Sequence, residues 1–179
     1  MKLSAQEEYG IRCLLQLTRA SRGSMTAAEI AAAEGLSEPY VAKLLRLLRQ
    51  AELVESIRGA QGGYRLARPA SELFLSAVVR ALGGDLYTPD FCQRFSGDRS
   101  VCAHTCECGL RALWAGIGDV VRGLLERCSL EQLARSEHDM RGWVATQLAA
   151  IARSDVGIAR SDVGIARHDA AVTRSDAPA

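Results

Sequence analysis

Four of the six cysteines lie close together in the second half of the chain. Cys92, Cys102 and Cys108 are separated by nine and five residues, and Cys106 lies just before the last of them. Thiolates are soft ligands that hold iron–sulfur clusters and zinc. Zinc sites usually have close cysteine pairs with roughly two to four residues between them. The wider spacing therefore favours an iron–sulfur cluster, with zinc as the competing interpretation.

The other candidate ligands are less distinctive. Cys106 is too near Cys108 for the two thiolates to share a metal ion in an easy geometry, so it is a spare cysteine, a resolving thiol or an alternative ligand. His104 is a possible nitrogen ligand or a solvent-exposed loop residue. Cys13 and Cys128 fall on apolar faces of predicted helices, where we expect them to be buried and structural.

The composition bears on the redox state of these thiols. Hydrophobic residues make up 48% of the 179 and charged residues 24%, which is typical of a soluble globular protein. We find neither a signal-peptide h-region at the N-terminus nor an apolar run that could cross a membrane, so we expect a cytoplasmic protein. Thiols stay reduced there, which favours metal ligation or redox chemistry over structural disulfides.

Three segments position the cysteines. Residues 1–68 are predicted to form helices followed by a hairpin, residues 69–140 a helix, the cysteine loop and a long helix, and residues 141–179 a repeat tail. The net charge of +1 gives no overall signal for nucleic acid, but the excess of Lys and Arg lies in the first segment.

Capping patterns mark three helices in the first segment. They begin at Ser4, Thr26 and Ser37, and a Glu three residues after each of the first two completes a capping box. The third helix has one buried stripe and one basic or polar face. The stripe consists of Val41, Leu44, Leu45 and Leu48, and the opposite face carries Lys43, Arg46 and Gln50. The last two helices are predicted to form a helix-turn-helix.

A Gly-rich hairpin follows this helix. Strand-like runs at 53–57 and 64–66 flank Arg58 and the glycines after it. A basic face on a three-helix bundle is often merely solvated, but an adjoining basic wing adds phosphate contacts and favours DNA binding. The expected fold is mainly α with a small β-hairpin, a winged helix-turn-helix followed by a long dimerisation helix.

The second segment predicts a helix over 73–82, ended by Gly83, and a second helix after the cysteine loop. Apolar residues of this second helix recur in steps of four and three, at Leu110, Trp114, Ile117, Val121, Leu124 and Cys128. The seam is too short for an independent coiled coil, so we expect it to pack on its copy in a homodimer. The alternative is a core helix within one chain.

The tail repeats a seven-residue unit at 151–157 and 158–164. Gly157 and Gly164 weaken a helix, and one Ile per unit buries little surface. We expect a low-complexity, poorly ordered tail, and the alternative is a weak coiled coil.

Residues 36–45, the RGxxGGY wing at 58–64 and the three cysteines ahead of 110–114 resemble the bacterial Rrf-type winged-helix regulators. That family includes IscR, NsrR and CymR, and the resemblance covers about residues 1–134. It implies a homodimer centred on the helix over 110–127. It also implies a recognition helix in the major groove, Arg58 near the minor groove, and an iron–sulfur cluster, 2Fe–2S or 4Fe–4S, on Cys92, Cys102 and Cys108. The predicted contacts with double-stranded promoter DNA are Lys2, Ser37, Glu38, Pro39, Tyr40, Lys43, Arg58, Gly59, Gln61 and Arg65.

The fourth cluster ligand departs from one pattern of the family. Members that resemble IscR have a His three residues after the last cysteine, where this chain has Arg111. Relatives of the nitric-oxide sensor use a carboxylate in the first helix of the other subunit, and Glu8 lies at the matching place. Glu8 is therefore the leading fourth ligand, ahead of His104, Cys106 and Glu7. Otherwise Glu8 is a solvated helix residue.

Together these features predict a transcriptional regulator, and not an enzyme, that senses redox state, nitric oxide or iron–sulfur status through its cluster. The alternative is a regulator without a cluster that senses oxidation through its thiols. The chain has no CxxC motif and no convincing nucleophile–base arrangement, which argues against a thiol oxidoreductase.

Overall fold

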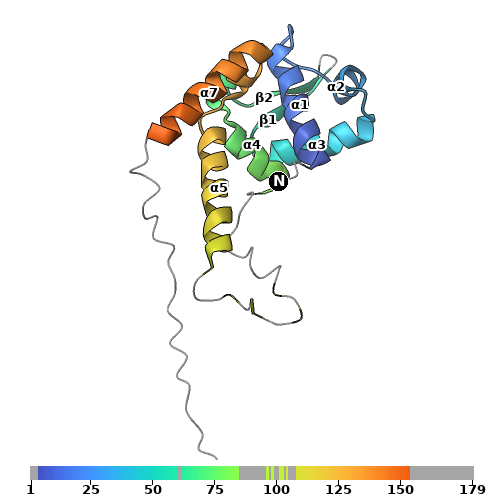
Figure 1. Ribbon diagram of the computed structural model, residues 1–179. Coiled ribbons are helices and arrows are strands. Elements are labelled where there is room, and N and C mark those ends of the chain that lie inside the picture. Colours follow the sequence, from blue (N-terminus) through green and yellow to red (C-terminus); the bar gives the residue numbers. More distant parts are fainter. Residues whose placement is uncertain are drawn as a thin grey trace, which may run out of the picture.

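The computed structural model describes residues 4–59, 62–84, 96, 98, 101, 102, 104 and 108–153. These residues form a mainly helical body with one two-stranded antiparallel hairpin, as the sequence predicted (Figure 1). In chain order the elements are α1 (Ala5–Arg19), α2 (Ala27–Glu34), α3 (Glu38–Gln50), β1 (Val54–Ile57), β2 (Gly63–Leu66), the 3-10 turn η1 (Ala70–Glu72), α4 (Leu75–Leu82), α5 (Gly109–Leu125), α6 (Leu130–Leu133) and α7 (Glu137–Arg153).

The helix starts follow the local capping signals. Both predicted capping boxes are present, one at the start of α1 and one at the start of α2. Gly35 ends α2 in the left-handed conformation, with φ of 66°, which glycine adopts without steric cost. Ser37 is the N-cap of α3, as predicted, but its side chain makes no capping hydrogen bond. Pro39, with its fixed φ, lies in the first turn of α3.

The core lies between the first three helices, α4 and the segment around α6. The predicted stripe of α3 is fully buried in it, at Val41, Leu44, Leu45 and Leu48. Cys13 and Cys128 are also buried among these apolar side chains, as predicted. Burial raises the pKa of the Cys13 thiol to about 12 and raises the pKa of Cys128. Both are therefore uncharged packing residues at neutral pH.

The hairpin is fastened to the body through its second strand. Met25 and Tyr64 exchange two backbone hydrogen bonds of 3.0 and 2.8 Å. This pairing brings the backbone of Met25 against Gly63, where a Cβ atom would lie 2.6 Å from the Met25 carbonyl oxygen. The glycine is therefore required for the attachment of the hairpin.

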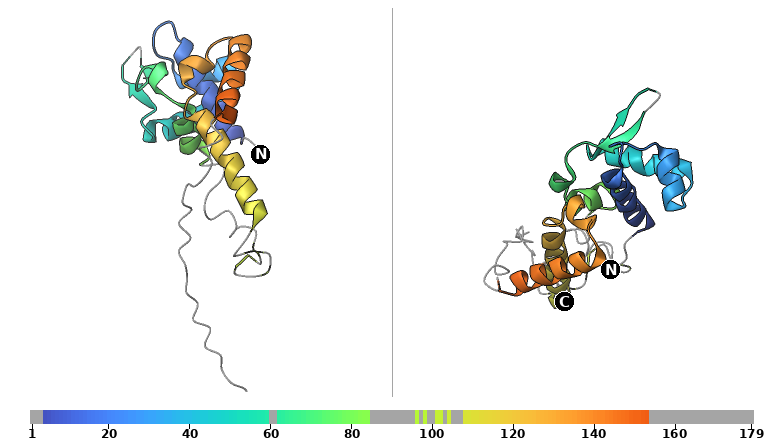
Figure 2. Two further views of the ribbon diagram at one scale, coloured as in Figure 1. Left: turned by 60° about the vertical axis from the view of Figure 1, so that its left-hand side comes forward. Right: turned by 90° about the horizontal axis from the view of Figure 1, so that it is seen from above.

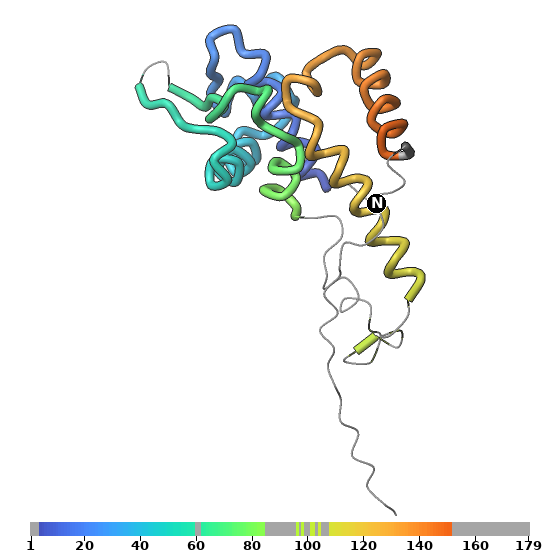
Figure 3. The backbone as a smooth tube through the Cα atoms, turned by 90° about the vertical axis from the view of Figure 1, so that its left-hand side faces the viewer, coloured from blue at the N-terminus to red at the C-terminus, as the bar shows by residue number. Residues whose placement is uncertain are grey.

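Helix α5 projects from the body, and α7 contacts it (Figures 2 and 3). Helix α7 was not predicted from the sequence, and the expected start of the repeat tail, residue 141, lies inside this helix. The stretch over 143–153 lacks glycine and proline and is rich in good helix formers. Met140 and Trp143 anchor it to the core. The rest of the predicted tail, 154–179, lies outside the described residues.

Candidate functional site

The exposed face of α3 is basic. Lys43, Arg46 and Arg49 are all exposed, on the side opposite the buried leucines. Glu38 and Pro39 are exposed in the first turn, and no described residue covers this face. The arrangement leaves three cations along one helix free to meet an anionic partner.

The start of α3 is held by a network from α1 and α2. Tyr40 makes an edge-to-face contact with Tyr9 of α1, with ring centroids 6.1 Å apart. The Arg12 guanidinium lies 5.4 Å from the centre of the Tyr9 ring. Its Nε donates a 2.5 Å hydrogen bond to Glu34, and Gln16 donates to the other carboxylate oxygen of Glu34 at 2.6 Å. Tyr40 is therefore half-buried, and the network sets the position of the first turn of α3.

The hairpin follows α3 in the chain and projects from the helical body (Figure 2). It carries further cations. Arg58 and Gly59 are exposed where β1 ends, and Gly59, with φ of 107°, turns the chain. Arg65 is exposed on β2 but forms an ion pair with Glu55 of β1. The pairing of Glu55 with Arg65 was not predicted from the sequence, although residues that face each other across a hairpin can be counted from its turn. Lys2 and Gln61, two other predicted DNA contacts, lie outside the described residues.

Two of the predicted cluster ligands are described. Cys102 and Cys108 are half-buried, and neither is in a disulfide. Cys92 and Cys106 lie outside the described residues, and within the described ones no three metal-binding side chains gather at one point. His104 is exposed. The ligand set therefore stays a prediction.

Cys108 is the N-cap of α5. Its Sγ accepts a 3.4 Å hydrogen bond from the backbone N–H of Arg111. A helix N-terminus favours a negative charge, because its first N–H groups have no partner within the helix and the helix dipole is positive there. The Cys108 Sγ lies at this position. Arg111 contacts the Cys108 Sγ through its backbone N–H.

The two carboxylates that were predicted as possible ligands, Glu7 and Glu8, lie in the first turn of α1 and differ in exposure. Glu7 is buried, and its Oε2 accepts a 2.7 Å hydrogen bond from the Ser4 backbone. Glu8 is exposed. Of the two carboxylates, only that of Glu8 is available to a ligand or a second molecule.

The first turn of α1 also packs on Gly83, which ends α4 and precedes the cysteine loop. A Cβ atom on Gly83 would collide with Glu7 Oε1, and the Gln6 side-chain amide donates to the Leu82 carbonyl oxygen. The Gly10 backbone is also in contact with the Leu82 side chain. The end of α4 is therefore held against the turn of α1 that carries Glu8.

The first half of α5 exposes its apolar seam together with the neighbouring Leu113. The exposed fractions of Leu110, Leu113, Trp114 and Ile117 are 60%, 55%, 41% and 40%. Among the described residues nothing covers these side chains. The other half behaves differently, since Leu125 packs on the core and Cys128, just after α5, is buried. An apolar face of this kind marks an interaction surface.

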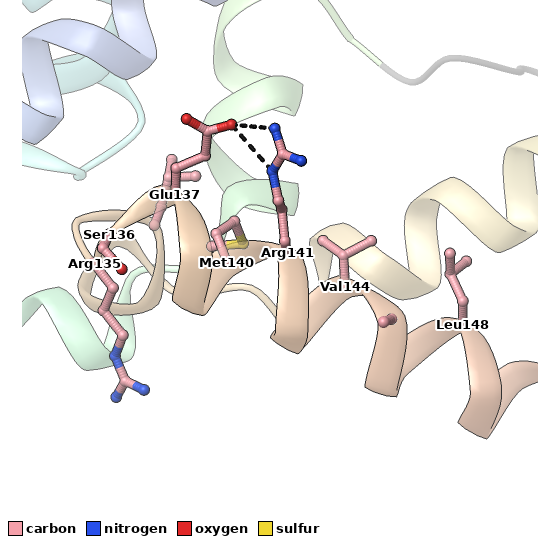
Figure 4. Close-up of a pocket in the computed structure, with 9 residues that line it drawn as sticks. Arg135, Ser136, Glu137, Met140, Arg141, Val144 and Leu148 are labelled. Atoms are coloured by element: carbon pink, nitrogen blue, oxygen red, sulfur yellow. Dashed lines mark hydrogen bonds and ion pairs between the residues drawn. The ribbon is translucent and has the colours of Figure 1, made fainter.

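An apolar groove lies along α7, which contacts α5 (Figure 4). Its volume is about 610 Å³. Met140, Val144 and Leu148 supply apolar side chains along one side of α7, and the Glu137–Arg141 ion pair lies at one end. None of the described residues that line the groove is a Cys or a His, so these residues offer no soft metal ligand.

The sequence profile of the Rrf2 family, described as "Iron-dependent Transcriptional regulator", matches residues 3–136. Among curated proteins, the chain is 33% identical to the HTH-type transcriptional regulator CymR of Bacillus subtilis over 135 residues, which are 75% of this chain and 90% of CymR. It is 31% identical to the HTH-type transcriptional regulator IscR of Photorhabdus laumondii over 138 residues, 76% of this chain and 81% of IscR.

Solved structures agree with this match. The structure of T. potens IscR superimposes with a TM-score of 0.60 at 28% identity, covering 74% of this chain and 85% of that one. CymR of B. subtilis superimposes with a TM-score of 0.57 at 29% identity, covering 75% of this chain and 96% of that one. The oxidized form of CymR from Staphylococcus aureus gives a TM-score of 0.60 at 29% identity, covering 76% and 98%.

Proposed function

The chain belongs to the Rrf2 family of transcriptional regulators, and on that basis we propose that it controls promoters as a homodimer whose DNA affinity depends on a cysteine-ligated iron–sulfur cluster. It is a DNA-binding regulator and not an enzyme. The observation that carries the proposal is the place of Cys108. This thiol caps the helix that exposes the apolar seam, so one residue joins the proposed sensor to the proposed dimer interface.

The proposed DNA interface consists of α3 and the wing. Lys43, Arg46 and Arg49 give α3 a basic face for the major groove, and Arg58 gives the wing a cation for the neighbouring backbone or minor groove. Two such units in a homodimer read two half-sites. The other proposed contacts with DNA are those predicted from the sequence: Lys2, Ser37, Glu38, Pro39, Tyr40, Gly59, Gln61 and Arg65.

Substitution of single cations tests this interface. Lys43→Ala and Arg58→Ala should each weaken binding to promoter DNA and reduce the slope of its logarithmic salt dependence by about 0.9 for each phosphate that the variant no longer neutralises. Arg135→Ala is a matched control, because this exposed cation follows α6 and belongs to neither α3, nor the wing, nor the proposed dimerisation helix. Binding curves of duplex DNA at several salt concentrations measure both quantities. Equal affinities for all three variants and the unchanged protein would place the DNA surface elsewhere.

The proposed cluster ligands are Cys92, Cys102, Cys108 and, from the other subunit, Glu8. Cys102 and Cys108 fit this role as half-buried thiols outside any disulfide, and the Cys108 Sγ accepts the Arg111 backbone N–H at the N-terminus of α5. When bound, a cluster with three thiolates and one weaker carboxylate supplies an iron site that reacts with oxidants or nitric oxide. Exposed Glu8 lies on the turn of α1 that holds the end of α4, so its engagement would act on the DNA-binding body.

Purification without oxygen tests the cluster. We expect a coloured protein with iron and acid-labile sulfide, and a Glu8→Ala variant whose cluster decays faster in air. Glu131→Ala, an exposed carboxylate on α6, is the control and should leave cluster lifetime unchanged. A colourless protein with stoichiometric zinc would contradict the cluster. Equal cluster lifetimes for the Glu8→Ala protein and the unchanged one would show that Glu8 is not a ligand. The three cysteines would remain the proposed ligands.

The likeness to CymR favours a second candidate. One of the similar structures is described as an oxidized form of CymR, and this chain has Cys106 close to Cys102 and Cys108 in sequence. A regulator without a cluster would sense oxidation through a disulfide among these thiols. Such a regulator would be colourless, and its DNA binding would depend on oxidant. Purification without oxygen therefore distinguishes it from a protein that binds a cluster.

A further inference from the structure

An ion pair lies on the outer face of the wing. Glu55 stands directly opposite Arg65 in the hairpin register, and Arg65 Nε donates to a Glu55 carboxylate oxygen. The neighbouring pair, Val54 and Leu66, packs toward the core. Successive side chains of a strand point to opposite faces, so Glu55 and Arg65 point away from the core. About half of each side chain is exposed, 46% for Glu55 and 55% for Arg65.

This pairing distinguishes Arg65 from the other proposed DNA-binding cations. Within the described part of the chain, Lys43, Arg46, Arg49 and Arg58 have no carboxylate within ion-pair distance. Among the described cations of the proposed interface, Arg65 is the one whose charge is paired with a carboxylate. The partner is on the adjacent strand, where the antiparallel register keeps it within reach.

A DNA phosphate and Glu55 would compete for the same guanidinium. An exposed ion pair contributes little to stability, so a phosphate can displace the carboxylate. The displaced carboxylate cannot move far, because the hairpin holds its backbone opposite Arg65. It would then lie close to the phosphate and repel it.

We propose that Glu55 weakens the contact of Arg65 with the DNA backbone and so lowers the affinity of the wing for DNA of arbitrary sequence. This inference rests on the proposed DNA-binding function. Phosphate contacts supply most non-specific affinity, whereas base contacts supply discrimination. A wing with one of its cations partly neutralised leaves a larger share of the binding energy to α3, which increases the preference for a promoter site over bulk DNA.

The test compares four full-length proteins: the unchanged chain, Glu55→Gln, Arg65→Gln and the double variant. Each binds a labelled short duplex of random sequence at several salt concentrations. Glu55→Gln should bind about twofold to fivefold more tightly than the unchanged protein at low salt. The slope of its logarithmic salt dependence should steepen by up to about 0.9, the value for one more phosphate contact. Neither gain should appear when Glu55→Gln is added to Arg65→Gln.

Two outcomes would contradict this inference without contradicting the proposed DNA-binding function. If Glu55→Gln strengthens binding equally with and without Arg65, the carboxylate acts through net charge and not through its partner. If it leaves affinity and slope unchanged, it does not restrain Arg65. Glu131→Gln on α6, an equal change in charge away from the wing, is the control and should leave both quantities unchanged. If the unchanged protein binds no duplex at all, the proposed DNA-binding function fails as well.

Discussion

At the scale of single residues, Gly63 shows how closely the wing is fitted to the body. Its backbone conformation, with φ of 153°, is one that side-chain-bearing residues rarely adopt, and a Cβ atom would meet the Met25 carbonyl oxygen at 2.6 Å. The neighbouring atom belongs to backbone, so it cannot move aside as a side chain could. The pairing of Met25 with Tyr64 depends on this approach.

Gly63→Ala should therefore lower the free energy of unfolding by about 1–3 kcal/mol. Gly142→Ala is the control: this glycine lies in α7, and a methyl group added to it would have no heavy atom within 4 Å. There an alanine should stabilise the helix by about 0.5–1 kcal/mol. Urea unfolding of both variants measures the difference. Equal stabilities would show that the wing adapts without strain.

Cys13 gives a prediction about pH. Burial raises the pKa of its thiol to about 12, well above the ordinary value of 9.0. Between these two values the unfolded chain has released the proton while the folded chain keeps it, so stability falls as pH rises. The decrease from this residue is at most about 1.4 kcal/mol per pH unit. Cys13→Ala is less stable at neutral pH, because it leaves a cavity, but its stability should fall less steeply between about pH 9 and pH 11. Parallel curves for the two proteins would contradict this assignment.

At the scale of elements, the buried carboxylate of Glu34 joins α2 to α1. Arg12 and Gln16 both donate to it, and the side chain of Glu34 is only 7% exposed. Through Arg12 and Tyr9 this network reaches Tyr40 at the start of α3.

Glu34→Ala should lower the free energy of unfolding by about 1–3 kcal/mol, because it leaves two donors without their acceptor. It should also weaken DNA binding, since Tyr40 loses part of its support. Glu137→Ala is the control, because its ion pair with Arg141 is largely open to solvent and should be worth less than about 1 kcal/mol. Thermal and urea unfolding distinguish the two. Similar decreases in both variants would mean that the Glu34 network does not hold the helices together.

At the scale of the whole molecule, the first half of α5 needs a partner that the described part of the chain does not supply. Four apolar side chains are between 40% and 60% exposed along it. A second copy of the chain brings an equivalent seam, and an isologous contact buries both at once.

Trp114→Glu should therefore convert the dimer to a monomer, because it places a charge in the centre of an apolar interface. Sedimentation velocity measures the change. Phe74→Glu is the control, since Phe74 is exposed to a similar extent, 40%, but lies at the start of α4. A dimer that survives Trp114→Glu, with the helix content unchanged, would place the interface elsewhere.

Much of the body follows from signals that act over a few residues. The two capping boxes, the left-handed turn at Gly35 and the buried stripe of α3 were all predicted from the sequence. Capping bonds join residues three apart, and helix periodicity repeats within one turn, so both can be recognised in the sequence. Helix α7 was not predicted, because its stability depends on the packing of Met140 and Trp143 on the core, which is a contact between distant segments.

The sequence by itself therefore determined the helices of the DNA-binding body, the hairpin and the residue types of the cysteine site. Only the tertiary structure decided how residues of the same type differ in burial and in contact partners. Glu7 is buried in a capping box against Gly83, whereas Glu8 beside it is exposed. The Gly63 backbone lies against the Met25 backbone, and Arg12 of α1 is paired with Glu34 of α2. These differences arise from contacts between separate segments, and local sequence signals do not report such contacts.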